Sequence, residues 1–338
     1  MPETFFALSP RDRRDVLGVA ATRSGRRAHL LEKDVWVVWA LEVLFGAPFG
    51  HALVFKGGTS LSKAYQAIGR FSEDVDLTYD IRAIAPELAP PGSEGLPETR
   101  SQEQRWTKII RDRLNVWTHD VVAPLLRQRL QEADLAADVR VDADTVRIAY
   151  DAQTAGSGYV VSAVLLEFGA RATGEPSERR DVVCDAARHV LDVTFPTAAP
   201  SVMRPERTFW EKATAIHVFC RGGHFRGAER FSRHWYDIVA LDRASLVDPA
   251  IRDRDLARRV ARHKGMFFRE KDGRGQAIDY DAAVLGDLHL VPDGAATELL
   301  AEDYAGMIGD GLFFEEAPSF SSLLLQCEEI ERRANQLD

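Results

Sequence analysis

The chain has 338 residues, of which 45% are hydrophobic and 28% charged, so it can bury a large core and is too apolar for wholesale disorder. No stretch approaches about 18 uncharged apolar residues, which excludes a membrane-spanning helix, and early charged residues exclude a secretory signal. The net charge of −9 argues against a wholly basic nucleic-acid-coating protein, although it permits a local basic surface. Three scattered cysteines and nine histidines without paired spacing predict neither a disulfide framework nor a structural zinc. We therefore expect a reduced, cytoplasmic protein that does not bind a membrane.

The first 200 residues are expected to mix helices with strands. A helix is predicted over 31–46, because apolar residues recur at helical spacing and Gly46 provides a stop. A short buried strand at 52–55 leads into Gly57–Gly58, and Thr59 or Ser60 would cap a helix over 60–68. The segments that follow are a strand at 74–80, a proline-rich loop at 85–99, a helix at 101–133 that Pro124 kinks or splits, and strands at 138–149, 159–168 and 188–195.

The character of the chain changes after Pro196 and Pro200, where helical patterns take over. The predicted helices cover residues 205–219, 232–242, 254–264, 295–306 and 319–335. We therefore expect an α/β (α+β) protein with two domains. A core with a mixed sheet would occupy 1–200, and an α-helical lobe carrying Lys212 and Asp237 would occupy 201–338.

The most informative stretch runs from residue 54 to 78. Asp74 and Asp76 are two residues apart in a predicted strand, so they project from one face and can hold one or two divalent cations through oxygen ligands. Gly57 and Gly58 would let the backbone approach a phosphate closely, and the helix start at Thr59–Ser60 adds N–H donors. Each motif is common by itself, but two acids flanking Val75 in an apolar strand are costly unless a cation compensates. The combination favours phosphoryl or nucleotidyl transfer.

These motifs also carry a family resemblance. The order apolar–Gly-Gly–Thr/Ser, then Asp–apolar–Asp–apolar, resembles the signature of the DNA-polymerase-β-like nucleotidyltransferases. The specific version, FKGGTSLSKAY followed by RFSEDVDL, resembles the AbiEii/AbiGii-type toxin family, which includes the MenT toxins of bacterial toxin–antitoxin pairs. Five further segments support the resemblance, namely LEKDVWVVWALEVLF (31–45), RPERTFWEKATAIH (204–217), RHWYDIVAL (233–241), HKGMFF (263–268) and the carboxy-terminal FEEAPSFSSLL…EIERRAN.

The resemblance implies a polymerase-β-like nucleotidyltransferase core and a reaction. An NMP would pass from an NTP to an RNA acceptor, the 3′ end of a tRNA, with the help of Mg²⁺ or Mn²⁺, and the product would block translation. The resemblance also implies a cognate antitoxin, in this family often a winged-helix repressor encoded alongside.

Polymerase-β-like sites usually have a third acidic residue on a later strand. The best candidate is Glu167, which follows three apolar residues in VLLEF, and Asp192 in HVLDVTF competes with it. The resemblance implies that Lys212 contacts the triphosphate, where an ammonium ion offsets charge on the leaving pyrophosphate. Asp237 is either a structural partner of Lys212 or Arg233, or part of the active site, and the two roles are compatible.

Other polar residues flank the phosphate turn and the Asp pair. Lys63 falls one helical turn after Thr59–Ser60 and could point toward the phosphates. Ser72 could bond a phosphate oxygen or cap the turn into Glu73–Asp74. The residues expected to contact the nucleotide are Lys56, Gly57, Gly58, Thr59, Ser60, Lys63 and Ser72.

Residues 252–274 form a basic segment with seven arginines and two lysines against four acids. Arg258, Arg259, Arg262 and Lys264 could cover one side of a helix and contact an RNA backbone. A solvated helix surface is the alternative. The adjacent pair Phe267–Phe268 is expected in the core.

Two other functions stay open. The same fold can transfer a nucleotide to a protein side chain or a small molecule, or the chain can be a non-catalytic relative that only binds a nucleotide or a partner. The Asp74–Asp76 pair speaks against the second, because a binding module does not need two metal-binding acids.

Overall fold

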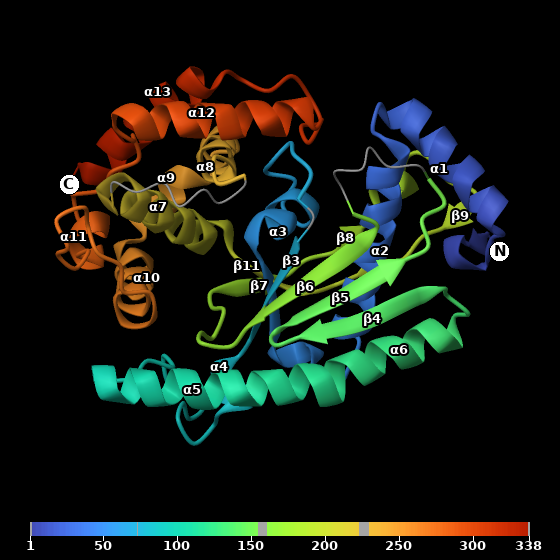
Figure 1. Cartoon of the computed structure of the whole chain (residues 1–338), viewed down its shortest axis with the longest axis horizontal. Coiled ribbons are helices and arrows are strands. Elements are labelled where there is room, and N and C mark those ends of the chain that lie inside the picture. Colours follow the sequence, from blue (N-terminus) through green and yellow to red (C-terminus); the bar gives the residue numbers. More distant parts are fainter. Residues whose placement is uncertain (1, 73, 155–160, 223–229, 337–338) are drawn as a thin grey trace. The chain divides into compact units, whose positions relative to one another are not determined.

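The computed structural model describes residues 2–72, 74–154, 161–222 and 230–336, which fold into two compact units (Figure 1). The first unit takes in residues 1–64, 72–95 and 105–203, and the second takes in residues 65–71, 96–104 and 204–338. Two short segments from the first third of the chain therefore belong to the second unit. The expected two domains, divided near residue 200, stay a prediction.

A mixed seven-stranded sheet forms the centre of the first unit (Figure 1). Its strand order is β4-β5-β6-β3-β2-β11-β7, in which the pairs β3–β6 and β2–β11 are parallel and the others antiparallel. The mixed sheet expected from the sequence is confirmed. The strands are β2 (Leu53–Lys56), β3 (Asp74–Tyr79), β4 (Ala137–Asp142), β5 (Thr145–Tyr150), β6 (Ala163–Gly169), β7 (Ser177–Arg179) and β11 (Ser201–Met203).

Four shorter strands form two small sheets outside the central one. The pairs are β1 with β9 and β8 with β10. Their bounds are β1 (Glu3–Thr4), β8 (Val182–Val183), β9 (Val193–Thr194) and β10 (Thr197–Ala198).

Helices cover the apolar face of the central sheet. Trp36 of α2 stacks on Tyr150 of β5 with 5.0 Å between ring centroids, and Trp117 at the end of α5 stacks on Tyr79 of β3 at 4.3 Å. Such aromatic contacts bury large areas and fix the helices on the sheet. The helices are α1 (Pro10–Ser24), α2 (Ala28–Phe45), α3 (Gly57–Lys63), α4 (Ile81–Ile84), α5 (Arg100–Trp117) and α6 (Ala123–Glu132), with 3-10 turns at Phe5–Ala7, Gly50–Ala52 and Asp185–Arg188.

The long helix predicted over 101–133 is split, as the position of Pro124 suggests. A π-helical turn at Thr118–Val122 joins α5 to α6, and Pro124 sits in the first turn of α6, where its missing N–H is tolerated. The Thr118 hydroxyl donates to the Asn115 carbonyl at 2.9 Å and the Ala143 carbonyl at 2.8 Å.

Three strand predictions differ from the structure. The run 138–149 is a hairpin, because Ala143 adopts a positive φ of 53° and turns the chain between β4 and β5. The strand predicted at 188–195 is wrong: a 3-10 turn ends at Arg188 and only Val193–Thr194 is extended. The strand predicted at 159–168 corresponds to β6, which begins at Ala163, and residues 159–160 lie outside the described residues.

Three consecutive charged residues at the start of α2 are buried and tie the first unit together. The Glu32 carboxylate accepts hydrogen bonds from the backbone N–H groups of Gln153 and Thr154 at 2.7 and 3.0 Å. Lys33 Nζ donates to the Val161 carbonyl at 3.3 Å. Asp34 accepts from the Asp185 N–H at 2.6 Å. Buried charges need such partners, so this segment is structural.

Lys63, at the end of α3, completes this buried network. Its Nζ lies 2.5 Å from Asp34 Oδ1 and 2.7 Å from Asp185 Oδ1, and Arg26 also pairs with Asp185. Burial raises the pKa of Asp34 to about 6, although Lys63 acts in the opposite direction. The network therefore fastens α3 to α2 and to the Asp185–Arg188 turn.

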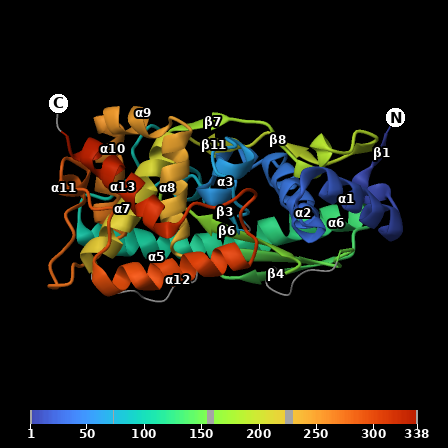
Figure 2. The ribbon, with the colours of Figure 1, turned by 90° about the horizontal axis from the view of Figure 1, so that it is seen from above.

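Helices make up the second unit. Helix α8 packs against both α7 and α13 (Figure 2). Two buried tryptophans on these helices have satisfied indole N–H groups, because Trp210 donates to the Ala250 carbonyl at 2.9 Å and Trp235 to the Leu290 carbonyl at 2.7 Å. The helices are α7 (Pro205–Gly222), α8 (Arg233–Arg243), α9 (Val247–Arg252), α10 (Arg254–Phe267), α11 (Tyr280–Val284), α12 (Gly294–Gly309) and α13 (Phe320–Asn335).

None of the helices within the described ranges combines the length and the apolar character that crossing a bilayer requires.

We predict that Lys63→Met lowers the free energy of unfolding by about 3–5 kcal/mol, because it leaves the Asp34 and Asp185 carboxylates without their shared cation. The loss should be smaller at about pH 6 than at about pH 8, since without Lys63 the buried Asp34 carboxyl can keep a proton. Urea unfolding measures both. Lys108→Met, at an exposed helix position, is the control and should change stability by less than about 0.5 kcal/mol. Equal stability of the two variants would contradict a structural role for the network.

Candidate functional site

Charged side chains from three adjacent strands share one face of the central sheet. Asp76 of β3 pairs in register with Glu167 of β6 on one side and Lys56 of β2 on the other. Residues paired in register project from the same face, and Asp74 joins them because it is two positions before Asp76. Lys56 Nζ lies 3.8 Å from Asp76 Oδ1. Asp74 and Asp76 are half-buried and Glu167 is exposed.

Burial of the alternate residues of β3 fixes this orientation. Val75 and Leu77 are fully buried on the face that the helices cover. A slip of one residue would move both carboxylates into the core and both apolar side chains out of it. The register of β3 is therefore strongly specified, and with it the face that carries the acids.

Gly57 lies directly against the Asp76 carboxylate. Its φ is +77°, and a Cβ at this position would lie 2.0 Å from Asp76 Oδ2 and 2.9 Å from Asp76 Cγ. Only glycine combines this backbone conformation with so close an approach. The glycine turn thus brings backbone next to the acid pair, as the sequence suggested.

The two hydroxyl residues of the turn bond to backbone. Thr59 Oγ1 donates to the Asp74 carbonyl at 2.5 Å, and Ser60 Oγ donates to the Gly57 carbonyl at 2.9 Å. The expectation that Thr59 or Ser60 caps the helix is wrong, because α3 already begins at Gly57 with Lys56 as its N-cap. The Thr59 hydroxyl instead fastens the turn to the start of β3. Gly58 is buried beside them.

Two further residues predicted to contact the nucleotide lie elsewhere around this turn. The sequence places Lys63 near the phosphates, whereas the structure puts its Nζ between two carboxylates at the opposite end of α3 from Gly57. Lys63 is therefore an anchor of α3. Ser72 is half-buried, two residues before Asp74.

The strand register distinguishes the two candidates for a third acid. Glu167 lies beside Asp76 on the same sheet face. Asp192 is exposed and precedes β9, a strand of a separate two-stranded sheet. The arrangement thus favours Glu167 as the third acid.

The oxygen-rich donor set of this face fits a hard divalent cation. Mg²⁺ is bound through one or two carboxylates and keeps its other positions for water and substrate phosphates. Within the described ranges, no three His, Cys, Asp or Glu side chains are grouped closely enough to hold a metal ion by themselves. Asp74, Asp76 and Glu167 therefore do not form a complete ligand set by themselves, and their binding of an ion together with a phosphate-bearing substrate stays a prediction.

A second charged group lies in the second unit and centres on Asp237. Arg70 donates from Nε and Nη2 to the two Asp237 oxygens at 2.7 Å each, and Lys212 Nζ lies 2.8 Å from Asp237 Oδ2. Lys212 was one of two partners that the sequence suggested. Arg70 is 167 positions away along the chain, and its only signal was its place in the RFSEDVDL motif.

Burial and pairing act on these groups in opposite directions. Burial by itself would raise the pKa of Asp237, but Arg70 and Lys212 outweigh it and hold that pKa well below the usual range. Burial lowers the pKa of Lys212, and Asp237 opposes this. His234 is neutral, since burial and then Lys212 lower its pKa well below the usual value. The Asp237 carboxylate thus pairs with two cations at once.

The predicted RNA-binding residues do not all share one side of α10. Arg258, Arg259 and Arg262 are exposed. Lys264 is half-buried, and its Nζ lies 4.9 Å from the centroid of the Phe268 ring. Two residues beyond Arg262, it points about 200° away around the helix. The expectation that Phe267 and Phe268 are both core is wrong for Phe268, which is 38% exposed.

The chain matches the model of a known protein family. A family model described as "Nucleotidyl transferase AbiEii toxin, Type IV TA system" matches residues 39–326, which includes the Asp pair, the glycine turn, Lys212 and Asp237. Nucleotidyltransferases use an NTP and a divalent metal ion, in agreement with the carboxylates of the sheet. A search of curated proteins gives no match.

Among solved structures, the chain is similar to MenT4, a nucleotidyltransferase toxin from Mycobacterium tuberculosis H37Rv. The match has a TM-score of 0.51 at 17% sequence identity and covers 95% of this chain and 90% of that one. At this identity the likeness shows a shared fold. It confirms the expected nucleotidyltransferase core with a mixed sheet and accompanying helices.

We predict that Gly57→Ala weakens binding of an NTP in the presence of Mg²⁺ at least about tenfold, because the new methyl group must displace the Asp76 carboxylate. Fluorescence titration with a labelled NTP measures this. Gly92→Ala is the matched control, since Gly92 also has a positive φ, +83°, but a methyl group added there would meet no atom within 4 Å. Both variants should lose about 1–2 kcal/mol of stability through backbone strain. Unchanged NTP binding by Gly57→Ala would show that this turn does not face the nucleotide.

We predict that Asp237→Asn lowers the free energy of unfolding by about 3–5 kcal/mol at neutral pH, because it leaves Arg70 and Lys212 buried without their anion. The depressed pKa of Asp237 means that its contribution is present above about pH 4 and is lost as the pH falls further. Unfolding of wild type and variant at several pH values should therefore give curves that converge in acid. Asp138→Asn, at an exposed site, should stay within about 0.5 kcal/mol of wild type throughout. A difference for Asp237→Asn that does not depend on pH would contradict the assignment.

Proposed function

We propose the following reaction for this chain, which belongs to the AbiEii family of nucleotidyltransferase toxins of type IV toxin–antitoxin systems. The terminal 3′ hydroxyl of a tRNA attacks the α-phosphate of an NTP, the bond to the β-phosphate oxygen breaks, and pyrophosphate leaves. The hydroxyl proton passes to solvent, and the RNA gains one NMP. The proposal rests above all on the in-register row of Lys56, Asp76 and Glu167 beside the Gly57 turn.

The charged residues of the sheet face and the glycine turn would have different roles in the reaction. Asp74 and Asp76, with Glu167, would hold Mg²⁺ or Mn²⁺, which when bound neutralises triphosphate charge and activates the attacking hydroxyl. Lys56 balances the charge of Asp76 and would face the phosphates once the nucleotide is bound. The tight turn at Gly57–Gly58 lets backbone N–H groups approach a phosphate, and Thr59 and Ser60 hold that turn in place.

Lys212 and Asp237 belong to the second unit, and their part in the reaction stays a prediction from the family resemblance. The Lys212 ammonium would offset charge on the leaving pyrophosphate. Asp237 would position Lys212, because it bonds that ammonium and Arg70 at once. A displaced or neutral Lys212 could not serve this purpose, so the buried carboxylate would be needed for both stability and turnover.

The biological consequence follows from the acceptor. Amino acids are attached at the tRNA 3′ end, so an added nucleotide would prevent charging and block translation. Membership of a type IV toxin–antitoxin family implies a cognate antitoxin that restrains the activity. We propose that this partner is a winged-helix repressor encoded beside the toxin.

We predict that the purified chain, incubated with total tRNA, Mg²⁺ and each [α-³²P]NTP in turn, labels a tRNA band with at least one NTP. Asp74→Asn and Asp76→Asn should each lower the labelling rate roughly a thousandfold or more, since each removes a ligand of the ion that stabilises the transition state. Asp138→Asn again serves as the control and should label at the wild-type rate. A denaturing gel resolves the products.

Two outcomes would overturn the proposal. Wild-type labelling by either Asp variant would remove the assigned role of the acid pair. Label in protein, or in no macromolecule, with intact enzyme and any NTP would show that tRNA is not the acceptor.

A further inference from the structure

Helix α10 carries a cluster of arginines on its exposed side. Its inward side is apolar, and the buried residues there are Leu256, Ala257, Val260, Ala261 and Phe267. Because these residues are buried in the second unit, the opposite side of the helix faces solvent. Arg258, Arg259 and Arg262 are exposed there. Residues three and four apart on a helix are neighbours, so these three arginines lie on one exposed side of α10.

A fourth arginine extends the cluster beyond the end of the helix. Arg269 folds back along α10, where its Nε donates to the Gly265 carbonyl at 3.1 Å. Arg258 and Arg262 are about 6 Å apart along the helix axis, and Gly265 is about 4.5 Å further on. The cations therefore follow one another along the helix as a row.

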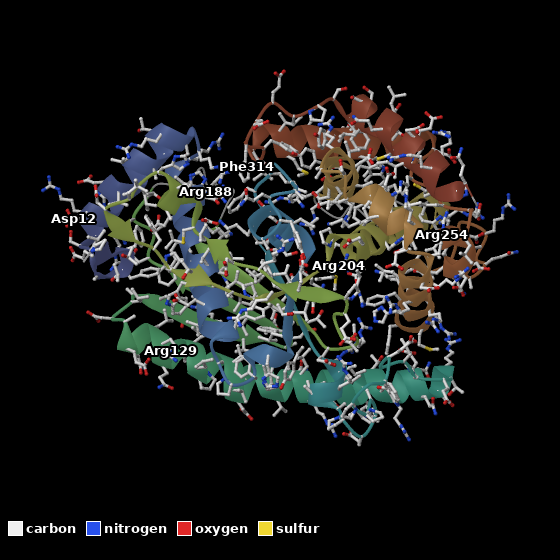
Figure 3. The ribbon with its side chains drawn as sticks, turned by 180° about the vertical axis from the view of Figure 1, so that it is seen from behind. Asp12, Arg129, Arg188, Arg204, Arg254 and Phe314 are labelled. Carbon is white, nitrogen blue, oxygen red and sulfur yellow. The ribbon has the colours of Figure 1, made fainter. Side chains whose placement is uncertain are left out.

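Other charges of this segment are already used within the fold. Arg254, at the start of α10 (Figure 3), donates to the carbonyls of Ala334 and Gln336 at 3.2 and 3.0 Å and so holds the end of α13. Asp253 caps the Leu256 N–H, and Asp272 accepts from the N–H groups that follow it. These acids keep their charge, but the four acids of residues 252–274 are outnumbered by seven arginines and two lysines, so the segment is basic overall.

Asp255 lies beside Arg258 of this row, and its effect is small. Asp255 Oδ1 is 3.3 Å from Arg258 Nη1, and the two side chains are 90% and 51% exposed. Exposed pairs of this kind are weak and yield readily to a stronger anion.

We propose that the row of Arg258, Arg259, Arg262 and Arg269 is a docking surface for the phosphate backbone of RNA. The inference deepens the proposed function, on which the identification of this RNA as the tRNA acceptor rests. Guanidinium groups bind phosphate through paired, charge-assisted hydrogen bonds, and a line of them suits a chain of phosphates better than a single small anion.

The surroundings favour RNA over a protein partner. Protein interfaces depend on buried aromatic or aliphatic anchors, and within residues 252–274 the one exposed large apolar side chain is Phe268, whose ring Lys264 covers at 4.9 Å. A chain of net charge −9 repels RNA in general. An RNA-modifying enzyme with that charge needs a local cationic surface, and this row supplies one.

The test compares two triple variants of the full chain for tRNA binding. Arg258→Gln/Arg259→Gln/Arg262→Gln removes three charges from the row, and Arg105→Gln/Arg111→Gln/Arg129→Gln removes three from exposed positions of α5 and α6 (Figure 3 labels Arg129). Anisotropy of a labelled tRNA is followed from about 50 to about 200 mM salt, without NTP and with EDTA, so that no transfer occurs. The row variant should bind about 10- to 100-fold more weakly than wild type, with a slope of log K against log salt shallower by about 2 to 3. The control variant should bind like wild type.

The outcomes separate this inference from the proposed function. Equal binding by both triple variants, or equal losses in both, would overturn the docking surface even if tRNA is labelled normally. Row-dependent binding without any labelling would support the surface and overturn the proposed acceptor chemistry. Loss of binding to anionic phospholipid vesicles in the row variant, with tRNA binding unchanged, would assign the row to lipid and overturn the proposal.

Discussion

Burial of Val75 and Leu77 is the constraint on which the candidate site depends. These side chains are fully buried under the helices that cover one face of the sheet, so Asp74 and Asp76 must project from the other face. Everything else at the site is placed relative to that strand. Glu167 and Lys56 lie beside Asp76 because β6 and β2 pair with β3 in a single register, and Gly57 follows Lys56 directly. Packing of the hydrophobic core thus fixes where the polar residues of the candidate site lie, although these residues are outside the core.

Each unit also contains a buried ionic network. In the first, Lys63 joins α3 to Asp34 of α2 and to Asp185, and so fixes the far end of the helix that begins at the glycine turn. In the second, Asp237 holds Arg70 and Lys212 together. Such networks add little stability compared with apolar packing, but breaking one is costly because a charge is left behind in a poor solvent. Their effect is to fix the positions of particular side chains.

The two networks contain different numbers of acidic and basic residues. Around Lys63, the carboxylates of Asp34 and Asp185 pair with Lys63, and Asp185 also pairs with Arg26. Around Asp237, one carboxylate pairs with both Lys212 and Arg70. A nucleotidyltransferase binds an NTP, whose triphosphate is a polyanion. The exposed arginine row on α10 suits the proposed RNA in a protein that is acidic as a whole.

The sequence by itself determined the fold class and the family, and it predicted the centre of the candidate site. The mixed sheet, the helix-rich second part and the Asp-x-Asp strand follow from short-range patterns, because strand and helix periodicities are local properties of the chain. The glycine turn and the acid pair lie within 25 residues of each other, so the sequence also predicted that they are close in space.

Only the tertiary structure decided which distant residues meet. Glu167 lies beside Asp76 because β6 pairs with β3, which no local pattern reveals. Lys63 was predicted to contact a phosphate, but it anchors α3 instead. Its partners Asp34 and Asp185 lie 29 and 122 positions away along the chain. Arg70 and Asp237 also pair over a long distance in the sequence. Lys264 does not lie with the exposed arginines, because it is on the side of α10 that packs inward. Each of these outcomes depends on strand register, burial or long-range charge pairing, and these are properties of the folded chain that its local sequence does not contain.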